Sequence, residues 1–164
     1  MAVSTVPKVR RDGTITLTDS GASNTYTVAY EDGDFSFSRT KAARIVVRDR
    51  GVIVGVRNGD APVMSLSFTV HLREFTNSTA DVLIDVLEET GAAASWTSVS
   101  SGAFEPYMLD CKLTIEGTDH SDQADATITL SKCLFEWDVS EGDPDKVSVK
   151  AEVYGGYTVT GISA

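Results

Sequence analysis

The segment 126–156, ATITLSKCLFEWDVSEGDPDKVSVKAEVYGG, constrains the fold more than any other part of this chain. Apolar and polar residues alternate on both sides of an acidic turn at 140–145, which contains the turn-forming residues Gly142 and Pro144. This pattern is typical of two long antiparallel strands that bury one face. A hairpin of this kind presents sheet surface to a partner and carries no residue pattern typical of catalysis.

The first of these two strands changes phase along its length. Ile128 and Leu130 share one parity, whereas Cys133 and the apolar residues after it share the other. One extra residue in the strand restores a single buried face, so the pattern predicts a β-bulge near Ser131 and Lys132.

A period of two runs through most of the remaining chain, as expected for half-buried strands. Met64, Leu66 and Phe68, for example, alternate with serines. We expect strands at 14–18, 25–30, 35–37, 44–48, 52–57, 63–73, 108–116, 125–137 and 146–154. Three of them, 44–48, 52–57 and 63–73, are predicted to form a meander with tight turns at Asp49–Gly51 and Asn58–Gly59.

A single helix is predicted between the strands, near 78–90. Ser78 and Asp81 have the spacing of a capping box, and Gly91 is expected to end the helix. Val82, Leu83, Val86 and Leu87 form an apolar stripe, and Asp81, Asp85 and Glu88 are expected on the solvent side. The following loop, 91–106, is long, and Trp96 and Phe104 are its expected anchors.

These elements predict a mainly β fold, an antiparallel β-sandwich or barrel with one flanking α-helix and long loops. The chain has 164 residues and a mass of 17.5 kDa, so we expect a single domain over 1–164. No run reaches the roughly 18 apolar residues of a membrane-spanning helix, and residues 1–13 lack the core of a signal peptide. A cytosolic site of synthesis is therefore expected, and no membrane partner.

The charge of the chain is acidic and uneven. The net charge is −10, which disfavours binding of nucleic acid through its phosphates. Residues 1–60 hold nine Lys and Arg against seven Asp and Glu, and residues 61–164 hold five against seventeen. This asymmetry is consistent with a solvated surface or with a contact between a basic region of one copy and an acidic region of the next. The candidate contact residues are Arg39, Lys41, Arg44, Arg48 and Arg50 on the basic side, and Glu141, Asp143 and Asp145 on the acidic side.

The sequence offers no combination of nucleophile and base, no phosphate-binding glycine motif and no zinc-binding spacing. His71 and His120 lack a neighbouring nucleophile in the sequence, and Asp119, Asp122 and Asp125 are interpreted as a solvated turn rather than a cation site. Cys111 and Cys133 follow apolar parity and are expected to be buried thiols, although adjacent strands would allow a disulfide. We therefore expect no enzyme activity, no metal and no cofactor.

The order of elements and the motif EWDVSEGDPDKVSVKAEVYGG resemble the tail tube proteins, or major tail proteins, of long-tailed bacteriophages and related gene transfer particles. The segment FSFSRTKAARIVVRDRG is similar to the projecting loop and hairpin with which those proteins contact their neighbours. The resemblance covers the order of elements over most of the chain.

The resemblance implies a structural virion protein that forms rings, usually of six subunits, which stack into a tube for DNA ejection. The partners it implies are further copies of the chain, the tape measure and other tail proteins, with DNA passing through without specific binding. It places the protein in the virion tail, assembled in the host cytoplasm. Because edge strands can pair between chains, the strand at 63–73 or the one at 146–154 is a candidate for pairing across subunits.

Two other classes of function remain open at this point. One is a different structural protein of a virion or secretion tube, such as a tail terminator, a capsid decoration protein or the tube protein of a type VI secretion system. The other is a monomeric β-sandwich binding module whose loop at 91–106 holds a sugar or a cation.

Overall fold

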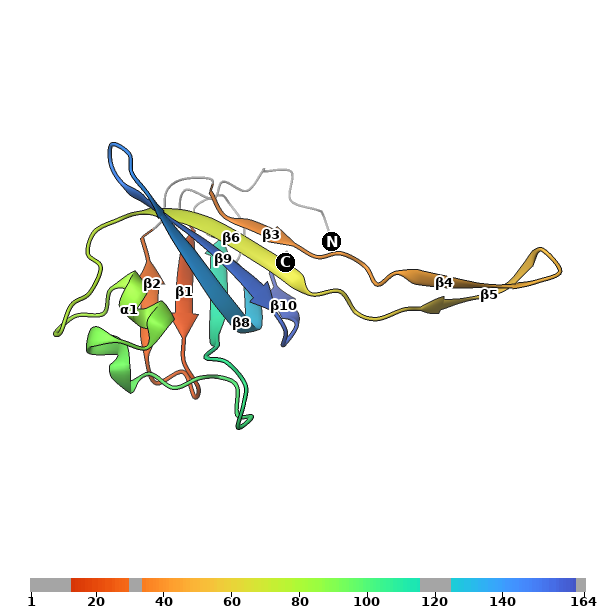
Figure 1. Cartoon of the computed structure of the whole chain (residues 1–164), viewed down its shortest axis with the longest axis horizontal. Coiled ribbons are helices and arrows are strands. Elements are labelled where there is room, and N and C mark those ends of the chain that lie inside the picture. The colour runs from red at the N-terminus through yellow and green to blue at the C-terminus, as the bar shows by residue number, and fades with distance from the viewer. Residues whose placement is uncertain (1–12, 30–33, 116–124, 162–164) are drawn as a thin grey trace.

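The computed structural model describes residues 13–29, 34–115 and 125–161. Within them the fold is mainly β with antiparallel pairing and a short flanking α-helix, as predicted (Figure 1). The elements are β1 Thr14–Thr18, β2 Thr25–Val28, β3 Ser36–Ser38, β4 Arg44–Asp49, β5 Val52–Asn58, β6 Met64–His71, α1 Leu83–Glu88, the 3-10 helix η2 Gly91–Ser95, β7 Leu109–Ile115, β8 Ala126–Ser140, β9 Lys146–Val153 and β10 Tyr157–Thr160.

The main sheet has the strand order β2-β1-β7-β8-β9-β6-β3, and the long strand β8 organises it. The first part of β8, Thr127–Leu130, pairs with β10, and the last part, Cys133–Ser140, pairs with β9. The exchange of partners divides the sheet into a β1 half, made of β2, β1, β7, the first part of β8 and β10, and a β6 half, made of the last part of β8, β9, β6 and β3.

The predicted bulge lies at this exchange and is confirmed. Leu109 pairs with Cys133 and Cys111 with Leu130, so that Ser131 and Lys132 together face one residue of β7. Lys132 adopts a left-handed backbone with φ of 54°, and its N–H donates a hydrogen bond to Asp110 Oδ1 at 3.0 Å. Gly155 crosses the bulge closely, since a Cβ at this position would lie 2.7 Å from the carbonyl oxygen of Ser131. The bulge thus bends β8 where its partners change.

The hydrophobic core lies between the two halves. Ile15 and Leu17 of β1 belong to the same buried cluster as Phe68 of β6 and Val149 of β9. The alternation expected for β6 is confirmed: Leu66, Phe68 and Val70 are buried and the intervening residues are not. The arrangement is sandwich-like, and it is not a closed barrel, because in the described residues β2 and β3 remain at opposite edges of the sheet.

The helix is shorter than predicted, and its start and end were predicted wrongly. The N-cap is Val82, without a side-chain cap, and the helix ends at Glu89, which has a left-handed backbone. The Asn77 side chain, rather than Ser78, organises the preceding turn by accepting hydrogen bonds from the N–H groups of Thr79 and Ala80. Asp85 was placed on the solvent side, but it is buried and binds backbone and side chains on both sides of α1.

The predicted meander is wrong at its second turn. β4 and β5 pair with each other in a separate two-stranded sheet, and β6 belongs to the main sheet between β9 and β3. Asn58–Gly59 does not turn the chain back on itself. Instead, the N–H of Gly59 donates to the carbonyl of Ala43 at 2.6 Å, so this site closes the root of the β4–β5 hairpin.

Of the two strands proposed for pairing between subunits, β9 is not at an edge, whereas β6 is covered by β3 only at Ser65–Ser67, so its Phe68–His71 part has no paired strand on that side among the described residues. β6 pairs with β9 along its whole length and with β3 over part of it, and β9 is enclosed between β6 and β8. In the part of the chain that the structure describes, the strands at the ends of the pairing order are β2 and β3, with β10 beside β8.

Candidate assembly surfaces

The β4–β5 hairpin projects from one end of the body as a thin ribbon (Figure 1). A tight turn was predicted at Asp49–Gly51 and is confirmed there, although Asp49 still belongs to β4, so that the turn itself consists of Arg50 and Gly51. Both residues have a left-handed backbone, with φ of 45° and 85°, which is the geometry of the turns that suit twisted two-stranded ribbons. The tip is also held by Arg48 Nη1, which donates to the carbonyl of Gly51 at 3.4 Å.

Both faces of this hairpin carry exposed aliphatic side chains. Val46 pairs with Val56 on one face, and Ile45 and Val47 lie on the other, opposite Arg57 and Gly55. Exposed fractions on the ribbon reach 67% at Val52. The exposed aliphatic residues of the hairpin are Ile45, Val46, Val47, Val52, Ile53, Val54 and Val56. Exposed aliphatic side chains gathered on one element are typical of an interaction surface.

The candidate contact residues identified from charge lie on or next to this ribbon. Arg44, Arg48 and Arg50 are part of the hairpin, and Arg39 and Lys41 lie at its root. The Arg39 guanidinium carbon lies 5.3 Å from the centre of the Tyr157 ring, a cation–π contact that fixes the root against β10. Sequence reasoning missed Arg57 and the aliphatic residues, although the run RIVVRDRGVIVGVR shows that apolar residues occupy both parities of these strands.

The acidic candidates lie at the opposite end of the molecule. Glu141, Asp143 and Asp145 belong to the β8–β9 turn, which projects from the body at the end far from the hairpin (Figure 1). The segment between β6 and α1, which contains Glu74 and Asp81, extends to the same end. The structure therefore keeps the basic and acidic residues of one copy apart. A contact between them requires a second copy, arranged head to tail.

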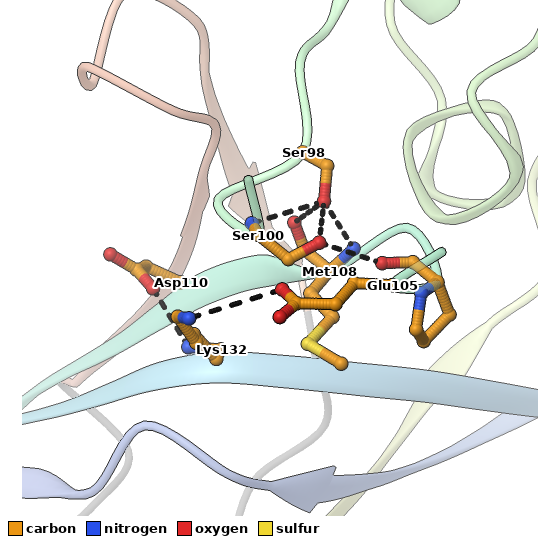
Figure 2. A network of polar contacts seen from close by, with 7 residues as sticks. Ser98, Ser100, Glu105, Met108, Asp110 and Lys132 are labelled. Atoms are coloured by element: carbon orange, nitrogen blue, oxygen red, sulfur yellow. Dashed lines mark hydrogen bonds and ion pairs between the residues drawn. The ribbon is translucent and has the colours of Figure 1, made fainter. Parts of the chain in front are cut away.

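The loop between η2 and β7 forms a second projecting feature. The N–H of Val99 donates to the carbonyl of Met108 at 2.9 Å, and Ser98 Oγ accepts from the N–H of Met108 at 3.0 Å. Figure 2 shows this network continuing through Ser100 Oγ, which donates to the backbone carbonyl of Pro106 at 2.9 Å. At the tip, Glu105 Oε2 lies 4.0 Å from Lys132 Nζ, on the bulge of β8. The loop is therefore held by hydrogen bonds at its base, and the exposed ion pair adds only a weak contact at its tip.

The two expected anchors of this loop behave differently. Trp96 is buried in the core, as predicted. Phe104 is fully exposed, so its prediction as an anchor is wrong. The turn that carries it is closed by the N–H of Glu105, which donates to the carbonyl of Gly102 at 3.1 Å, and this turn directs the ring away from the body.

Two buried carboxylates support the loops beside the core. Asp19 accepts hydrogen bonds from the backbone and side chain of Asn24 at 3.0 and 2.8 Å and from Thr97. Asp85 accepts from the N–H of Asn77 at 2.7 Å and from Thr90 Oγ1 at 2.9 Å. Burial alone would raise the pKa of both carboxyls, but the hydrogen bonds outweigh it and hold each pKa below its ordinary value.

The cysteines are both free and buried, which agrees with the prediction of buried thiols. Burial, the largest cause, raises the pKa of Cys133 to about 12 and also raises that of Cys111. Neither thiol is therefore suited to nucleophilic chemistry at neutral pH.

The outer face of the β6 half is covered by small hydroxyl and charged side chains. Ser67 pairs with Lys150, and Lys150 with Glu136, in one row across the sheet. Glu152 and Ser65 form the next row. A hollow of about 350 Å³ lies over these rows. Among the described residues that line it there is no aromatic ring, which is the usual platform for a sugar in a binding module.

The remaining chemical candidates add no site. Among the described residues no group of three or more His, Cys, Asp and Glu is arranged to hold a metal ion. Asp119, Asp122 and His120 lie outside the described residues, as does the Tyr30 end of the second predicted strand. Over the same described ranges no helix has the length and apolar composition needed to cross a membrane.

Comparison with known proteins identifies the class of assembly in which this fold occurs. No family model and no curated protein matches the chain. Six chains of solved structures match it, among them three that cover nearly all of its length. A chain of the anti-feeding prophage baseplate has a TM-score of 0.60 at 13% identity, with 100% of both chains covered.

The other two structures belong to extracellular contractile injection systems. A chain of the PVC sheath-tube complex in the extended state has a TM-score of 0.58 at 10% identity, covering 98% of this chain and 95% of its own. A chain of the PVC sheath/tube terminator in the extended state has a TM-score of 0.59 at 10% identity, covering 98% of this chain and 100% of its own. At these identities the likeness establishes a shared fold. The fold is that of components of phage-like injection particles, consistent with the resemblance to tail tube proteins.

Proposed function

We propose that the chain is a structural, non-catalytic subunit that self-assembles into stacked rings forming the tube of a phage tail or a related injection particle. The observation that carries this proposal is the β4–β5 hairpin. It is a two-stranded ribbon with aliphatic side chains exposed on both faces. Isolated two-stranded hairpins are marginally stable in water, so this one requires a surface that covers it.

A second copy supplies a suitable surface. The hairpin carries Arg44, Arg48, Arg50 and Arg57, and the opposite end of the molecule carries the acidic β8–β9 turn. Complementary patches at opposite ends produce a head-to-tail contact, and such contacts generate rings or filaments rather than closed dimers. The neighbours of this fold in solved structures come from sheath-tube, terminator and baseplate assemblies, which supports the same proposal.

The outer face of the β6 half suits the wall of a conduit. Small serines alternate there with Glu136, Glu152 and Lys150, and this face offers few apolar side chains to a passing polymer. We propose rings of six and passage of DNA through the tube, on the sequence resemblance.

The experiment that tests the proposal compares the wild-type chain with a variant in which residues 44–58 are replaced by a short Gly-containing turn. Negative-stain microscopy and sedimentation velocity would be measured over a range of protein concentrations. We expect rings or tubes from the wild type, and folded monomers from the variant with the circular dichroism spectrum of a β protein. Equal assembly of both proteins would contradict the proposed role of the hairpin.

A terminator or baseplate ring is the second candidate, because chains with this fold occur in both kinds of assembly. The same microscopy separates the two candidates. A tube subunit elongates as concentration rises, whereas a terminal ring stops at one layer.

A further inference from the structure

Phe104 is the most exposed large apolar side chain among the described residues. It lies at the tip of a loop whose base is closed by hydrogen bonds between Val99 and Met108 and between Ser98 and Met108. At the tip the backbone turns on a hydrogen bond from the N–H of Glu105 to the carbonyl of Gly102 at 3.1 Å. Because the backbone of the loop is already hydrogen-bonded, little backbone freedom would be lost when the exposed ring binds, and an aromatic side chain is a common interface anchor.

A hollow of about 380 Å³ at the root of the β4–β5 hairpin has the matching chemistry. Its apolar walls come from Ala42, Ala61, Pro62 and Met64, and Tyr157 and Arg39 complete it. The Tyr157 ring is already in contact with Phe37, at a centroid distance of 5.7 Å. An aromatic ring that enters the hollow would meet apolar carbon, a second ring and a guanidinium, all of which favour aromatic guests.

The charges beside the two features are also complementary. Glu105 follows Phe104 directly, and its present partner, Lys132, is 4.0 Å away and exposed. Arg39 lines the hollow and Lys41 is next to it in the sequence. A Phe104 ring seated in the hollow would bring the Glu105 carboxylate toward these cations.

We propose that Phe104 of one copy docks in the hairpin-root hollow of a second copy, with Glu105 facing Arg39. The loop and the hollow are different surfaces of the molecule, so the contact is head to tail and can be repeated from copy to copy. This inference rests on the proposed self-assembly and adds to it a second contact, separate from the aliphatic ribbon and the acidic turn.

A double-mutant cycle tests the contact. Phe104→Ala removes the ring, and Ala61→Trp fills the hollow. We expect each to raise the concentration needed for assembly about tenfold or more, as for an interface anchor. The double variant should be no worse than either single variant, because the two changes remove the same contact. Phe104→Tyr, which keeps the aromatic ring, and Ser101→Ala in the same loop are the matched controls and should assemble close to the wild-type concentration.

Cross-linking provides the second measurement. A Phe104→Cys variant mixed with an Ala61→Cys variant should form a disulfide-linked dimer under mild oxidation, and neither variant alone should do so. This contact alone would be overturned if the Phe104→Ala variant assembled at the wild-type concentration. It would also be overturned if the effects of the two substitutions on assembly added in the double variant and no cross-link formed. A wild-type chain that stays monomeric at every concentration would refute the proposed function and this contact together.

Discussion

Asp85 shows how a single residue connects several segments of this chain. Its carboxylate accepts hydrogen bonds from Asn77 before α1 and from Thr90 after it. Gly91 approaches so closely that a Cβ there would lie 2.3 Å from Asp85 Oδ2. The helix has six residues, and isolated helices of this length are unstable in water, so these contacts and the burial of its apolar side chains hold it in place.

We therefore predict that Asp85→Ala lowers the free energy of unfolding by about 3 kcal/mol, because buried donors lose a charged partner. Urea unfolding at neutral pH measures this change. Asp81→Ala, which alters an exposed carboxylate of the same segment, is the control and should change stability by less than about 0.5 kcal/mol.

The same carboxylates make stability depend on pH. The folded pKa values of Asp19 and Asp85 lie below the unfolded value of about 3.9, so their contribution is complete above that pH and is lost as the pH falls through the folded values. The wild type should therefore lose more stability between about pH 5 and pH 3 than Asp85→Ala does. Equal losses in both proteins would show that Asp85 is not ionised in the folded state.

The burial of a residue could be predicted where it follows from the alternation of apolar and polar residues along a strand. It could not be predicted where it depends on hydrogen bonds to other segments. The inward positions of β6 follow from alternation. Asp85 has no such signal, because its burial depends on Asn77 and Thr90, which the helical stripe does not include. Phe104 was misassigned for the related reason that an aromatic residue in a loop is usually an anchor, and only the loop geometry shows otherwise.

At the scale of elements, the bend in β8 is the feature that gives the sheet its two halves. Lys132 has a left-handed backbone there, a conformation that costs ordinary residues roughly 1–2 kcal/mol and β-branched residues more. We predict that Lys132→Val lowers stability by about 2 kcal/mol, whereas Lys132→Gly, which adopts this backbone freely, keeps wild-type stability or raises it. Thermal unfolding of the two variants measures the difference. Equal destabilisation by both would indicate that the Glu105 ion pair, and not the backbone, matters at this position.

The elements of the main sheet were largely predictable, and those of the projecting hairpin were predicted less completely. The phase change in β8 located the bulge because both parts of the strand bury one face. β4 and β5 have apolar residues on both parities, so their sequence does not distinguish a central strand from an uncovered ribbon. For the same reason Asn58–Gly59 could not be recognised as a hairpin root from local sequence.

At the scale of the whole molecule, the separation of charge predicts an assembly that depends on ionic strength. The basic hairpin and the acidic β8–β9 turn are exposed, and salt screens exposed charges beyond about 10 Å at 0.1 M. We expect assembly to weaken as salt rises and to weaken in the Arg44→Glu, Arg48→Glu, Arg50→Glu variant. Light scattering against salt concentration measures both effects, and assembly that ignores salt and charge reversal would exclude the electrostatic contact.

The net charge of −10 also predicts how assembled tubes treat DNA. Repulsion between phosphates and the carboxylates of many copies should prevent binding of free duplex DNA, even at low salt where electrostatic binding is strongest. A gel shift with assembled protein measures this. Binding that decreases steeply with salt would mean that cations of this chain face the DNA, and it would contradict a repulsive conduit.

In the proposed assembly, the basic β4–β5 hairpin of one copy lies on the acidic β8–β9 turn of the next copy. Cysteine cross-linking between two variants, Arg50→Cys and Asp143→Cys, tests it most directly, since Cys111 and Cys133 are buried. We expect disulfide-linked dimers when the two variants are mixed under assembly conditions, and none from either variant alone. Rings or tubes that form without any cross-link between the two variants would contradict it.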